Sequence, residues 1–403
     1  MLEEQDLGGG FGADDLTGLV ASVLAGKGRI GADAETLPPA AYTSQAFFDL
    51  EVERVFKTDW LCVGHVSQVA KVGDYFTLTL FGEPLVVVRG ADRIRVLSRV
   101  CLHRWAPVVA GEGNAKLFSC PFHKWGYGLD GQLLGAPFME QAADFDPKTC
   151  RLPELRSEIV APLGLIFVTF SDQIAPISDR LQDFAERYRN WGFADLVAVR
   201  PREDEETKKA PWTRNRFNWK VQVETFMECY HHIGAHTETF EIDQPARLSW
   251  CEEGKPGWTV CHSPYREDVP DSAYTIGLPI IPGIGEDQRQ VCDYVLLYPA
   301  TLLSIRPDSA GVLLLIPVGP QLTLSRSFTL VSPEAAAEPE RITQIFAERR
   351  TFFEKANQED TDVNEMQQAG AGSSLARAGR LGHLERTVAH LADYVRSRVA
   401  GNV

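Results

Sequence analysis

Residues 101–104 read CLHR, and residues 120–125 read CPFHKW. Each stretch supplies one cysteine and one histidine, Cys101 with His103 and Cys120 with His123. Two thiolates and two imidazoles can bind zinc, or a two-iron, two-sulfur cluster in which cysteines hold one iron and histidines hold the other. Structural zinc sites more often take a cysteine pair from one stretch and a histidine pair from another. The division found here therefore favours the mixed-ligand [2Fe-2S] cluster, a Rieske centre, with zinc as the alternative.

The chain around these stretches has the pattern of a small antiparallel β domain. Short runs rich in β-branched residues, such as DYFTLTLF at 74–81 and EPLVVVRG at 83–90, are separated by Gly, Pro and Asp. The run LGLIFVTF at 163–170 predicts a buried strand that either closes this domain or opens the next. We expect both Cys/His stretches to lie in loops at one tip of the domain, with the histidine edges near solvent.

A second cluster of metal-binding side chains lies at 228–236, which reads ECYHHIGAH. On a regular helix His232 and His236 share one face, because they are four residues apart, whereas His231 and His236 do not. Gly234 lies between them and weakens the case for a straight helix. A helix that ends or bulges after His231 would bring His231 and His236 together. The residues alone leave both pairs open.

Together these motifs resemble the oxygenase (alpha) components of the Rieske non-haem iron ring-hydroxylating and demethylating oxygenases. The family signature is Cys-x-His-Arg, a spacer, and Cys-Pro-Tyr-His-Gly-Trp. Arg104 and Trp125 match it, whereas Phe122 and Lys124 stand where Tyr and Gly are common. The resemblance implies a [2Fe-2S] cluster held by the four side chains Cys101, His103, Cys120 and His123.

The family also has a mononuclear non-haem Fe(II) site, whose motif resembles Asn218-Trp219-Lys220 followed by Glu228-Cys229-Tyr230-His231 and His236. The resemblance makes His231 and His236 ligands and leaves His232 as a neighbouring or pocket residue. It takes the third ligand, a carboxylate, from the stretch EDTDVNEMQQ at 359–368, where Asp360 has the ligand position and Asp362 is the competitor. Glu228 is implied to bridge the two metal sites by hydrogen bonds. A Glu at this position resembles the branch that attacks quaternary amines and related N-methyl compounds.

The rest of the chain predicts an α+β protein. Strand-like runs between 246 and 331 suggest one large antiparallel sheet, and helical patterns cover 44–60, 175–192, 212–232 and the last 70 residues. The first half of 212–232 is equally compatible with a strand. We expect an N-terminal arm and linker at 1–41, a small all-β Rieske domain at 42–160, and a helix-grip type catalytic domain with flanking helices at 161–403.

Composition excludes several partners. The 403 residues carry a net charge of −15, which argues against nucleic acid and anionic membranes. The first residues lack the pattern of a secretory signal, which predicts a cytoplasmic protein. The eight cysteines in a chain of this length are expected as buried small side chains rather than a disulfide framework.

These observations predict a terminal oxygenase that hydroxylates a small-molecule substrate with O2. The resemblance implies N- or O-demethylation or aromatic hydroxylation, electrons from a separate NAD(P)H-dependent ferredoxin or flavin reductase, and a homotrimer. Two alternatives remain, a Rieske electron carrier without catalytic iron and a zinc protein. Several aromatic residues of the sheet region could line a substrate pocket or belong to the core: Phe240, Trp250, Trp258, Tyr265, Tyr274, Tyr294 and Tyr298.

Overall fold

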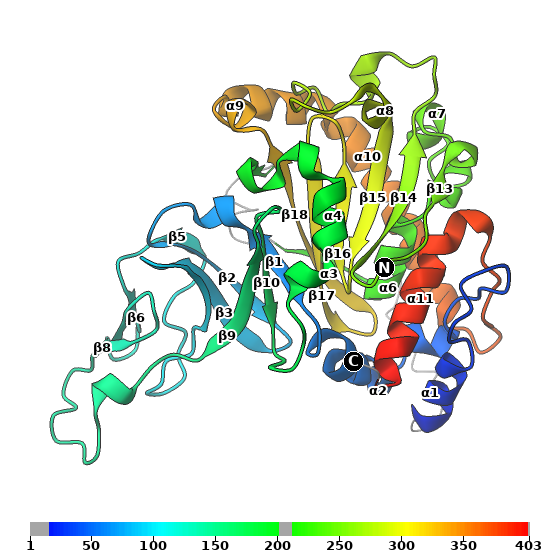
Figure 1. The fold of residues 1–403 in the computed structure, drawn as a ribbon. Helices are drawn as coiled ribbons and strands as arrows, with labels where there is room; N and C mark the ends of the chain where they lie inside the picture. The colour runs from blue at the N-terminus through cyan, green and yellow to red at the C-terminus, as the bar shows by residue number, and fades with distance from the viewer. Residues whose placement is uncertain (1–15, 201–211, 402–403) are drawn as a thin grey trace, which may run out of the picture.

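The first sheet is antiparallel and has seven strands in the order β1-β10-β9-β4-β3-β2-β5 (Figure 1). The structure, a computed structural model, describes residues 16–200 and 212–401. Val86, Val87 and Val88 in the centre of the sheet are fully buried, because successive side chains face two different hydrophobic cores. The strands are β1 (Leu61–His65), β2 (Asp74–Leu80), β3 (Glu83–Arg89), β4 (Ile94–Ser98), β5 (Glu112–Asn114), β9 (Glu154–Val160) and β10 (Leu165–Thr169).

A three-stranded sheet forms the tip of this first domain. It consists of β6 (Phe118–Ser119), β7 (Gly126–Tyr127) and β8 (Leu133–Gly135), and Figure 1 shows it at the end of the domain that lies away from the large sheet. The run at 163–170, whose domain was left open by the sequence, forms β10 and pairs with β1 and β9 of the first sheet. The expected boundary at 160–161 stays a prediction, and we propose to place it after β10.

The second sheet is larger and antiparallel, with the order β11-β18-β17-β16-β15-β14-β13, and β12 pairs with β18. The two longest strands, β17 and β18, form a hairpin of ten residues each. The strands are β11 (Val197–Val199), β12 (Thr213–Asn215), β13 (Trp250–Cys251), β14 (Trp258–Pro264), β15 (Val291–Leu297), β16 (Thr301–Ile305), β17 (Ala310–Gly319) and β18 (Leu322–Val331).

Helices cover both faces of the second sheet. Leu296 and Leu302 pack towards α6 and α11, whereas Val295 and Leu303, on the opposite face, pack towards α3 and α4. The expected α+β class with a small β domain before a large sheet and flanking helices is thereby confirmed. The helices are α1 (Leu16–Leu24), α2 (Gln45–Glu51), α3 (Ile177–Arg180), α4 (Gln182–Arg187), α6 (Trp219–Phe226), α7 (Phe240–Asp243), α8 (Glu286–Arg289), α9 (Pro333–Ala336), α10 (Pro339–Ala371) and α11 (Arg386–Val399).

Polar side chains fix the long helix α10 against the short helix α6. Asn218 caps α6 by accepting a hydrogen bond from the Lys220 backbone N–H, and its own backbone N–H donates to Gln368 Oε1 at 2.7 Å. One helical turn earlier on α10, Asn364 Oδ1 accepts from the hydroxyl of Thr225 at 2.6 Å. All of these side chains are buried. Because buried polar groups must find partners, these contacts select one register of α10 against α6.

The segment 212–232 is not one helix. It begins with the short strand β12, continues as α6 from Trp219, and ends in a separate 3-10 helix, η7 (Tyr230–Ile233). The expected helix at 175–192 is likewise divided at Leu181, whose backbone leaves the helical region, and it stops at Gly192, which has a φ of 56°. Pairing with β18 overrides the helical pattern of 212–215. The first 15 residues of the expected N-terminal arm lie outside the described residues.

No helix within residues 16–200 and 212–401 is both long and apolar enough to cross a membrane.

The contacts of Gln368 generate a prediction for stability. Gln368→Leu removes the acceptor of the Asn218 N–H and the donor to the Tyr42 carbonyl oxygen, both of them buried. We expect a loss of about 2 kcal/mol or more, because buried polar groups would be left without partners. Urea denaturation measures the change. Glu365→Ala, on the exposed side of the same helix, is the control and is expected to change the stability by less than about 0.5 kcal/mol; equal losses in both variants would contradict the assignment.

Candidate metal centres

The two Cys/His loops at the tip have the same backbone conformation. In one, the Trp105 N–H donates to the Cys101 carbonyl oxygen at 3.0 Å. In the other, the Lys124 N–H donates to the Cys120 carbonyl oxygen, also at 3.0 Å. Trp105 and Lys124, each four residues after its cysteine, have positive φ angles of 62° and 56°. The left-handed conformation explains why Gly is common at the position of Lys124 in the family. At Lys124 a residue with a side chain adopts this conformation, which costs about 1 kcal/mol relative to Gly.

The four predicted cluster ligands lie together around this pair of loops. Cys101 and Cys120 are buried, and the rings of His103 and His123 lie 4.6 Å apart, centre to centre. The Nδ1 atoms of both histidines are buried and have no hydrogen-bond partner among the described residues. An unpartnered buried nitrogen is costly unless something binds it, so two thiols and two bare Nδ1 atoms fit a [2Fe-2S] cluster with mixed ligands.

Neighbouring aromatic groups hold these ligands in place. The indole of Trp125 stacks on the His103 ring at 4.7 Å, and the hydroxyl of Tyr127 lies 3.2 Å from Cys101 Sγ. The outer surface of the tip is apolar, since Leu102, Trp105 and Phe122 are 39%, 78% and 53% exposed. The tip is therefore rigid inside and presents a hydrophobic surface outside.

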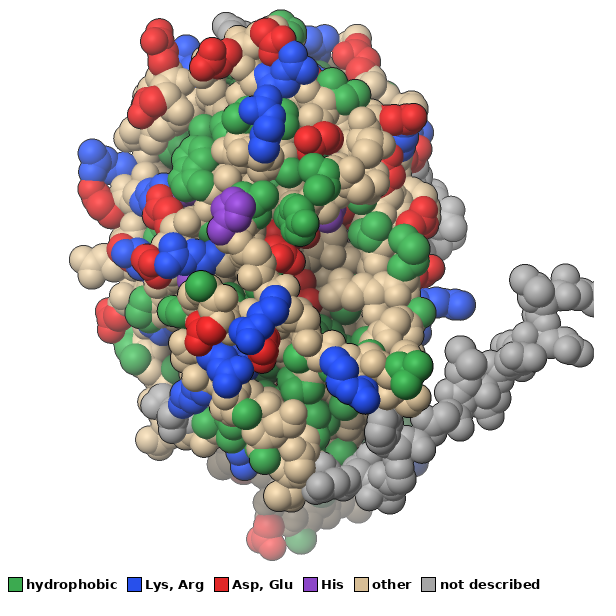
Figure 2. All heavy atoms as spheres, turned by 90° about the vertical axis from the view of Figure 1, so that its right-hand side faces the viewer, with side chains coloured by type: hydrophobic (Ala, Val, Ile, Leu, Met, Phe, Trp, Pro, Cys, Tyr) green, Lys and Arg blue, Asp and Glu red, His purple; other side chains and the backbone are tan. Residues whose placement is uncertain are grey.

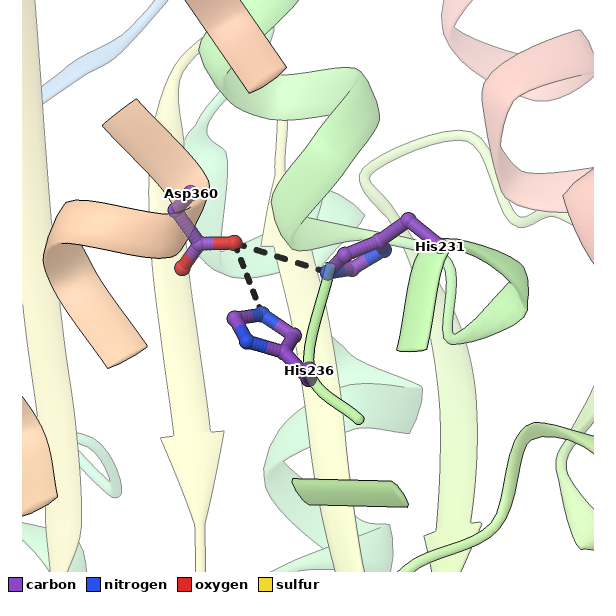
Figure 3. Close-up of side chains that lie close together, drawn as sticks. All are labelled: His231, His236 and Asp360. Carbon is purple, nitrogen blue, oxygen red and sulfur yellow. Dashed lines mark hydrogen bonds and ion pairs between the residues drawn. The ribbon is translucent and has the colours of Figure 1, made fainter. Parts of the chain in front are cut away.

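The second site is formed where η7 faces helix α10. His231 lies in η7, His236 follows it, and both Nε2 atoms point to Asp360 Oδ1, at 3.5 and 2.9 Å (Figure 3). Ligand atoms of the three residues lie within 4.8 Å of one another. The tight turn of the 3-10 helix changes the helical spacing and brings the pair five residues apart together. Two imidazoles and one carboxylate on one side of a common point form the donor set of a non-haem Fe(II) site.

Two further carboxylates orient the histidines. Glu228 Oε1 accepts from His231 Nδ1 at 2.9 Å, and Glu359 Oε2 lies 2.8 Å from His236 Nδ1. Glu359 is fixed in turn by the hydroxyl of Thr239 at 2.6 Å. A proton held on each Nδ1 leaves the Nε2 lone pair free for a metal and fixes the ring orientation. The role of Glu359 was missed at the level of sequence, although it directly precedes Asp360.

The two alternative candidate ligands, His232 and Asp362, point away from the metal site. His232 is buried, and its Nδ1 lies 3.0 Å from the Gln244 carbonyl oxygen, away from Asp360. Asp362 is exposed and accepts a hydrogen bond from Gln358 on the same helix. The structure therefore brings together His231, His236 and Asp360 and leaves His232 and Asp362 apart.

The site is strongly charged. Burial, which alone would raise the pKa of Asp360, is outweighed by hydrogen bonds from His231 and His236, so that this pKa is lowered to about 2. Burial would lower the pKa of His231, but hydrogen bonds to Asp360 and Glu228 raise it to about 10. The carboxylates thus stabilise positive charge at the point where the three residues meet, and a divalent cation can supply that charge.

A cavity of about 200 Å³ lies beside the three residues. Asp360, His231 and His236 line one part of it, and aromatic and polar side chains from α6, β15 and α10 line the rest. Figure 2 shows the right-hand side of the molecule as drawn in Figure 1, where acidic side chains are visible in a hollow near the centre, with hydrophobic side chains above it and basic ones below. The remaining lining residues include Phe226, Phe240, Tyr294, Phe353, Ser304 and Arg306.

Comparison with known protein families shows to which family the chain belongs. A family model described as "Rieske [2Fe-2S] domain" matches residues 59–152. A second, described as "Ring hydroxylating alpha subunit (catalytic domain)", matches residues 198–401, about half of the chain. The chain belongs to the family of ring-hydroxylating alpha subunits. The family resemblance read from the motifs, and its two expected cofactors, are thereby confirmed.

Among curated relatives, the carnitine monooxygenase oxygenase subunit of Escherichia coli (strain K12) is 35% identical over 217 residues, which are 53% of this chain and 56% of that protein. The glycine betaine monooxygenase oxygenase subunit of Pseudomonas aeruginosa (strain PAO1) is 32% identical over 207 residues, 50% of this chain and 45% of that protein. The chain thus spans about half the length of the curated relatives it matches.

Solved structures share the fold over most of the chain. A quaternary ammonium Rieske monooxygenase superposes with a TM-score of 0.74 at 25% identity, covering 91% of this chain and 96% of the other. Naphthalene 1,2-dioxygenase from Rhodococcus sp. superposes with a TM-score of 0.76 at 19% identity, covering 95% and 98%. The second likeness concerns the fold alone.

The choice between the two aspartates generates a prediction. Asp360→Ala is expected to leave the [2Fe-2S] cluster in place and to abolish binding of the third iron, because among the described residues Asp360 is the one carboxylate that meets the Nε2 atoms of both histidines. Asp362→Ala is the matched control on the same helix and should keep full iron content. Iron analysis per chain, with the cluster absorption as a folding check, measures both. Full iron content in Asp360→Ala together with loss in Asp362→Ala would reverse the assignment.

Proposed function

We propose that this chain is the terminal oxygenase of a multicomponent system and that it oxidises a quaternary ammonium compound at a carbon bound to nitrogen. The observation that carries the proposal is the triangle of His231, His236 and Asp360 beside a cavity with an aromatic lining. Supporting it are the identities with carnitine and glycine betaine monooxygenase subunits and the Glu at position 228. Aromatic rings stabilise a quaternary ammonium by cation–π contact.

We assign the two cofactors to residues as follows. Cys101, His103, Cys120 and His123 would hold the [2Fe-2S] cluster, and His231, His236 and Asp360 would hold mononuclear iron. When bound, the cluster supplies single electrons and the iron supplies the activation of O2. The remaining tasks, orienting the two histidines and excluding water, fall to side chains of this chain. Glu228 and Glu359 keep a proton on His231 Nδ1 and His236 Nδ1, and Phe226 and Phe240 exclude water from the cavity.

The overall reaction balances with components that such a system provides. A C–H group beside the quaternary nitrogen, O2, two electrons and two protons give the C–OH product and water. The resulting carbinol carbon then loses its bond to nitrogen and yields an aldehyde, an amine and one proton. When the oxidised carbon is an N-methyl group, the aldehyde is formaldehyde and the reaction is a demethylation.

We propose a separate NAD(P)H-dependent reductase, directly or through a ferredoxin, as the electron donor, and a homotrimer as the assembly. Within one chain, the tip with β6 and β8 lies at the opposite end from α6, α7 and α10 (Figure 1). The exposed apolar residues Trp105 and Phe122 on the tip, and Tyr230 and Ile233 beside the second site, are suited to contact between copies. The related quaternary ammonium monooxygenase is described as having inter-subunit electron transfer. In our proposal Glu228 lies at that contact as the bridging residue.

Oxygen consumption on a panel of quaternary ammonium compounds and aromatic acids tests the function. With NAD(P)H and a generic reductase, we expect O2 uptake on quaternary ammonium compounds, with one amine and one aldehyde formed per O2. Three irons per chain are expected, whereas an electron carrier holds two and a zinc protein holds none. A colourless protein without cluster absorption, or fully loaded protein that oxidises only aromatic acids, would refute the proposal.

The bridging role of Glu228 is tested by Glu228→Gln. The amide oxygen can still accept the His231 Nδ1–H, so both metal sites should remain filled. Loss of the carboxylate charge is expected to slow product formation at least tenfold, as is typical for residues that orient metal ligands. Product formation rate and iron content are measured on the same sample. Glu365→Gln, on the exposed side of α10, controls for the change of charge; full activity in Glu228→Gln would exclude the bridging role.

A further inference from the structure

Arg306 is a half-buried cation that the proposed mechanism does not use. It follows the last residue of the central strand β16, and its backbone is fixed on both sides. Its N–H donates to the Ser309 carbonyl oxygen at 2.9 Å, and its own carbonyl oxygen accepts from Trp191 Nε1 at 2.8 Å. The side chain therefore starts from a rigid position.

The guanidinium has few partners. It donates from Nη1 to Ser304 Oγ at 3.2 Å and also interacts with the hydroxyl of Tyr265, whereas no described carboxylate lies within 4.0 Å of it. The nearby acid Asp308 is engaged elsewhere, since it accepts from the backbone N–H groups of Ile276 and Leu278 at 2.8 and 3.1 Å. An arginine has five N–H donors and stays charged, so most of its binding capacity is left for a ligand.

The other neighbours do not neutralise it. Its electrostatic neighbours besides Asp308 are the thiol of Cys292 and the phenols of Tyr265 and Tyr294. Burial raises the pKa of Cys292 to about 11 and raises the pKa values of both tyrosines above their ordinary value. All three groups are therefore neutral at pH 7, and the positive charge of Arg306 is not offset by them.

Arg306 also lies where a substrate bound at the metal site can reach it. It lines the cavity beside the metal site and a neighbouring cavity of about 280 Å³, and Phe240 and Phe353 line both as well. A molecule held at the metal site by its cationic end can therefore extend towards the guanidinium. Charge-assisted bidentate binding of a planar anion is what a guanidinium does best.

We propose that Arg306 binds a carboxylate of the substrate, so that the substrate is a zwitterion with a quaternary ammonium at one end and a carboxylate at the other. The inference rests on the proposed function and narrows it to a substrate class. It also excludes substrates with a second cation at that end, because two positive charges would meet in the cavity.

Binding measurements on the iron-loaded protein test this. The probes are 4-(trimethylammonio)butanoate and the alcohol of the same length, 4-(trimethylammonio)butan-1-ol, which lacks the anion. Calorimetric titration should show the carboxylate binding about 10- to 100-fold more tightly than the alcohol, in line with a charge-assisted hydrogen-bonded pair. In Arg306→Gln that ratio should fall below about twofold, while the affinity for the alcohol is kept.

Two further variants make the test specific. Arg306→Lys keeps the positive charge but loses the bidentate geometry of the guanidinium, so a reduced preference for the carboxylate is expected. This variant keeps the test informative even if Arg306→Gln does not fold. Arg349→Gln removes a cation from the second cavity alone and should keep the full preference. The inference is overturned if the wild-type protein shows no preference or binds neither probe. It is equally overturned if Arg306→Lys binds both probes as the wild-type protein does.

The outcome also separates this inference from the proposed function. A preference that depends on Arg306, without aldehyde formation on loaded protein, would refute the oxygenase activity and keep the carboxylate site. Aldehyde formation without a preference would keep the activity and refute the site.

Discussion

The register of α10 against α6 is the constraint on which the second metal site depends. His231 and His236 come from the segment after α6, whereas Asp360 comes from α10, more than a hundred residues later. A shift of α10 by one residue would move Asp360 by about 1.5 Å along the helix and turn it by about 100° away from the histidines. The buried bonds from Asn218 to Gln368 and from Thr225 to Asn364 prevent that shift. They lie one and two turns beyond Asp360, so the side chains that form the site and those that place it are different.

A second polar contact connects helix α6 to the domain that precedes it in the chain. Lys220 on α6 is fully buried and pairs with Glu51 at the end of α2 at 2.7 Å. Burial lowers the pKa of Lys220 and raises that of Glu51, each effect opposed by attraction between the two groups. Such a pair contributes little net stability, but losing one member leaves an uncompensated charge. Its effect is to permit one arrangement of α6 against α2, and so to relate the metal site to the rest of the chain.

The prediction of both metal centres was based on local sequence motifs. Each set of candidate ligands can be recognised as a group because the residue types and their spacing in the chain are unusual, and the structure brings the members of each set together. What the sequence could not provide was the effect of tertiary packing. The 3-10 turn after α6 decides between His231 and His232, and it follows from how that segment packs on Gln244 and α10 rather than from helix propensity. The strand β12 could not be separated from α6 by composition, because its pairing partner β18 lies about 110 residues away.

Residues to which the sequence assigned no role were the hardest to foresee. Glu359 was visible as an acid in an acidic helix, and only the position of His236 shows that it is part of the site. Arg306 follows a strand as one of many arginines, and nothing in the sequence distinguishes a half-buried guanidinium that lines a cavity from an exposed one. Both depend on distances between elements that are far apart in the chain, which no local pattern encodes.

The charges of the cavity explain how a cationic substrate could approach a metal dication. Asp360 has its pKa lowered to about 2, and that of Glu359 is lowered too, because hydrogen bonds from Thr239 and His236 outweigh its partial burial. Together with Glu228, these carboxylates more than offset the two positive charges that ferrous iron would bring. The metal end of the cavity is then no longer repulsive to a quaternary ammonium, whereas the other end carries the positive charge of Arg306, which forms no ion pair within 4.0 Å among the described residues. A cavity with opposite charges at its two ends orients a zwitterion in one direction only, and this fixes which carbon faces the metal without requiring close shape complementarity.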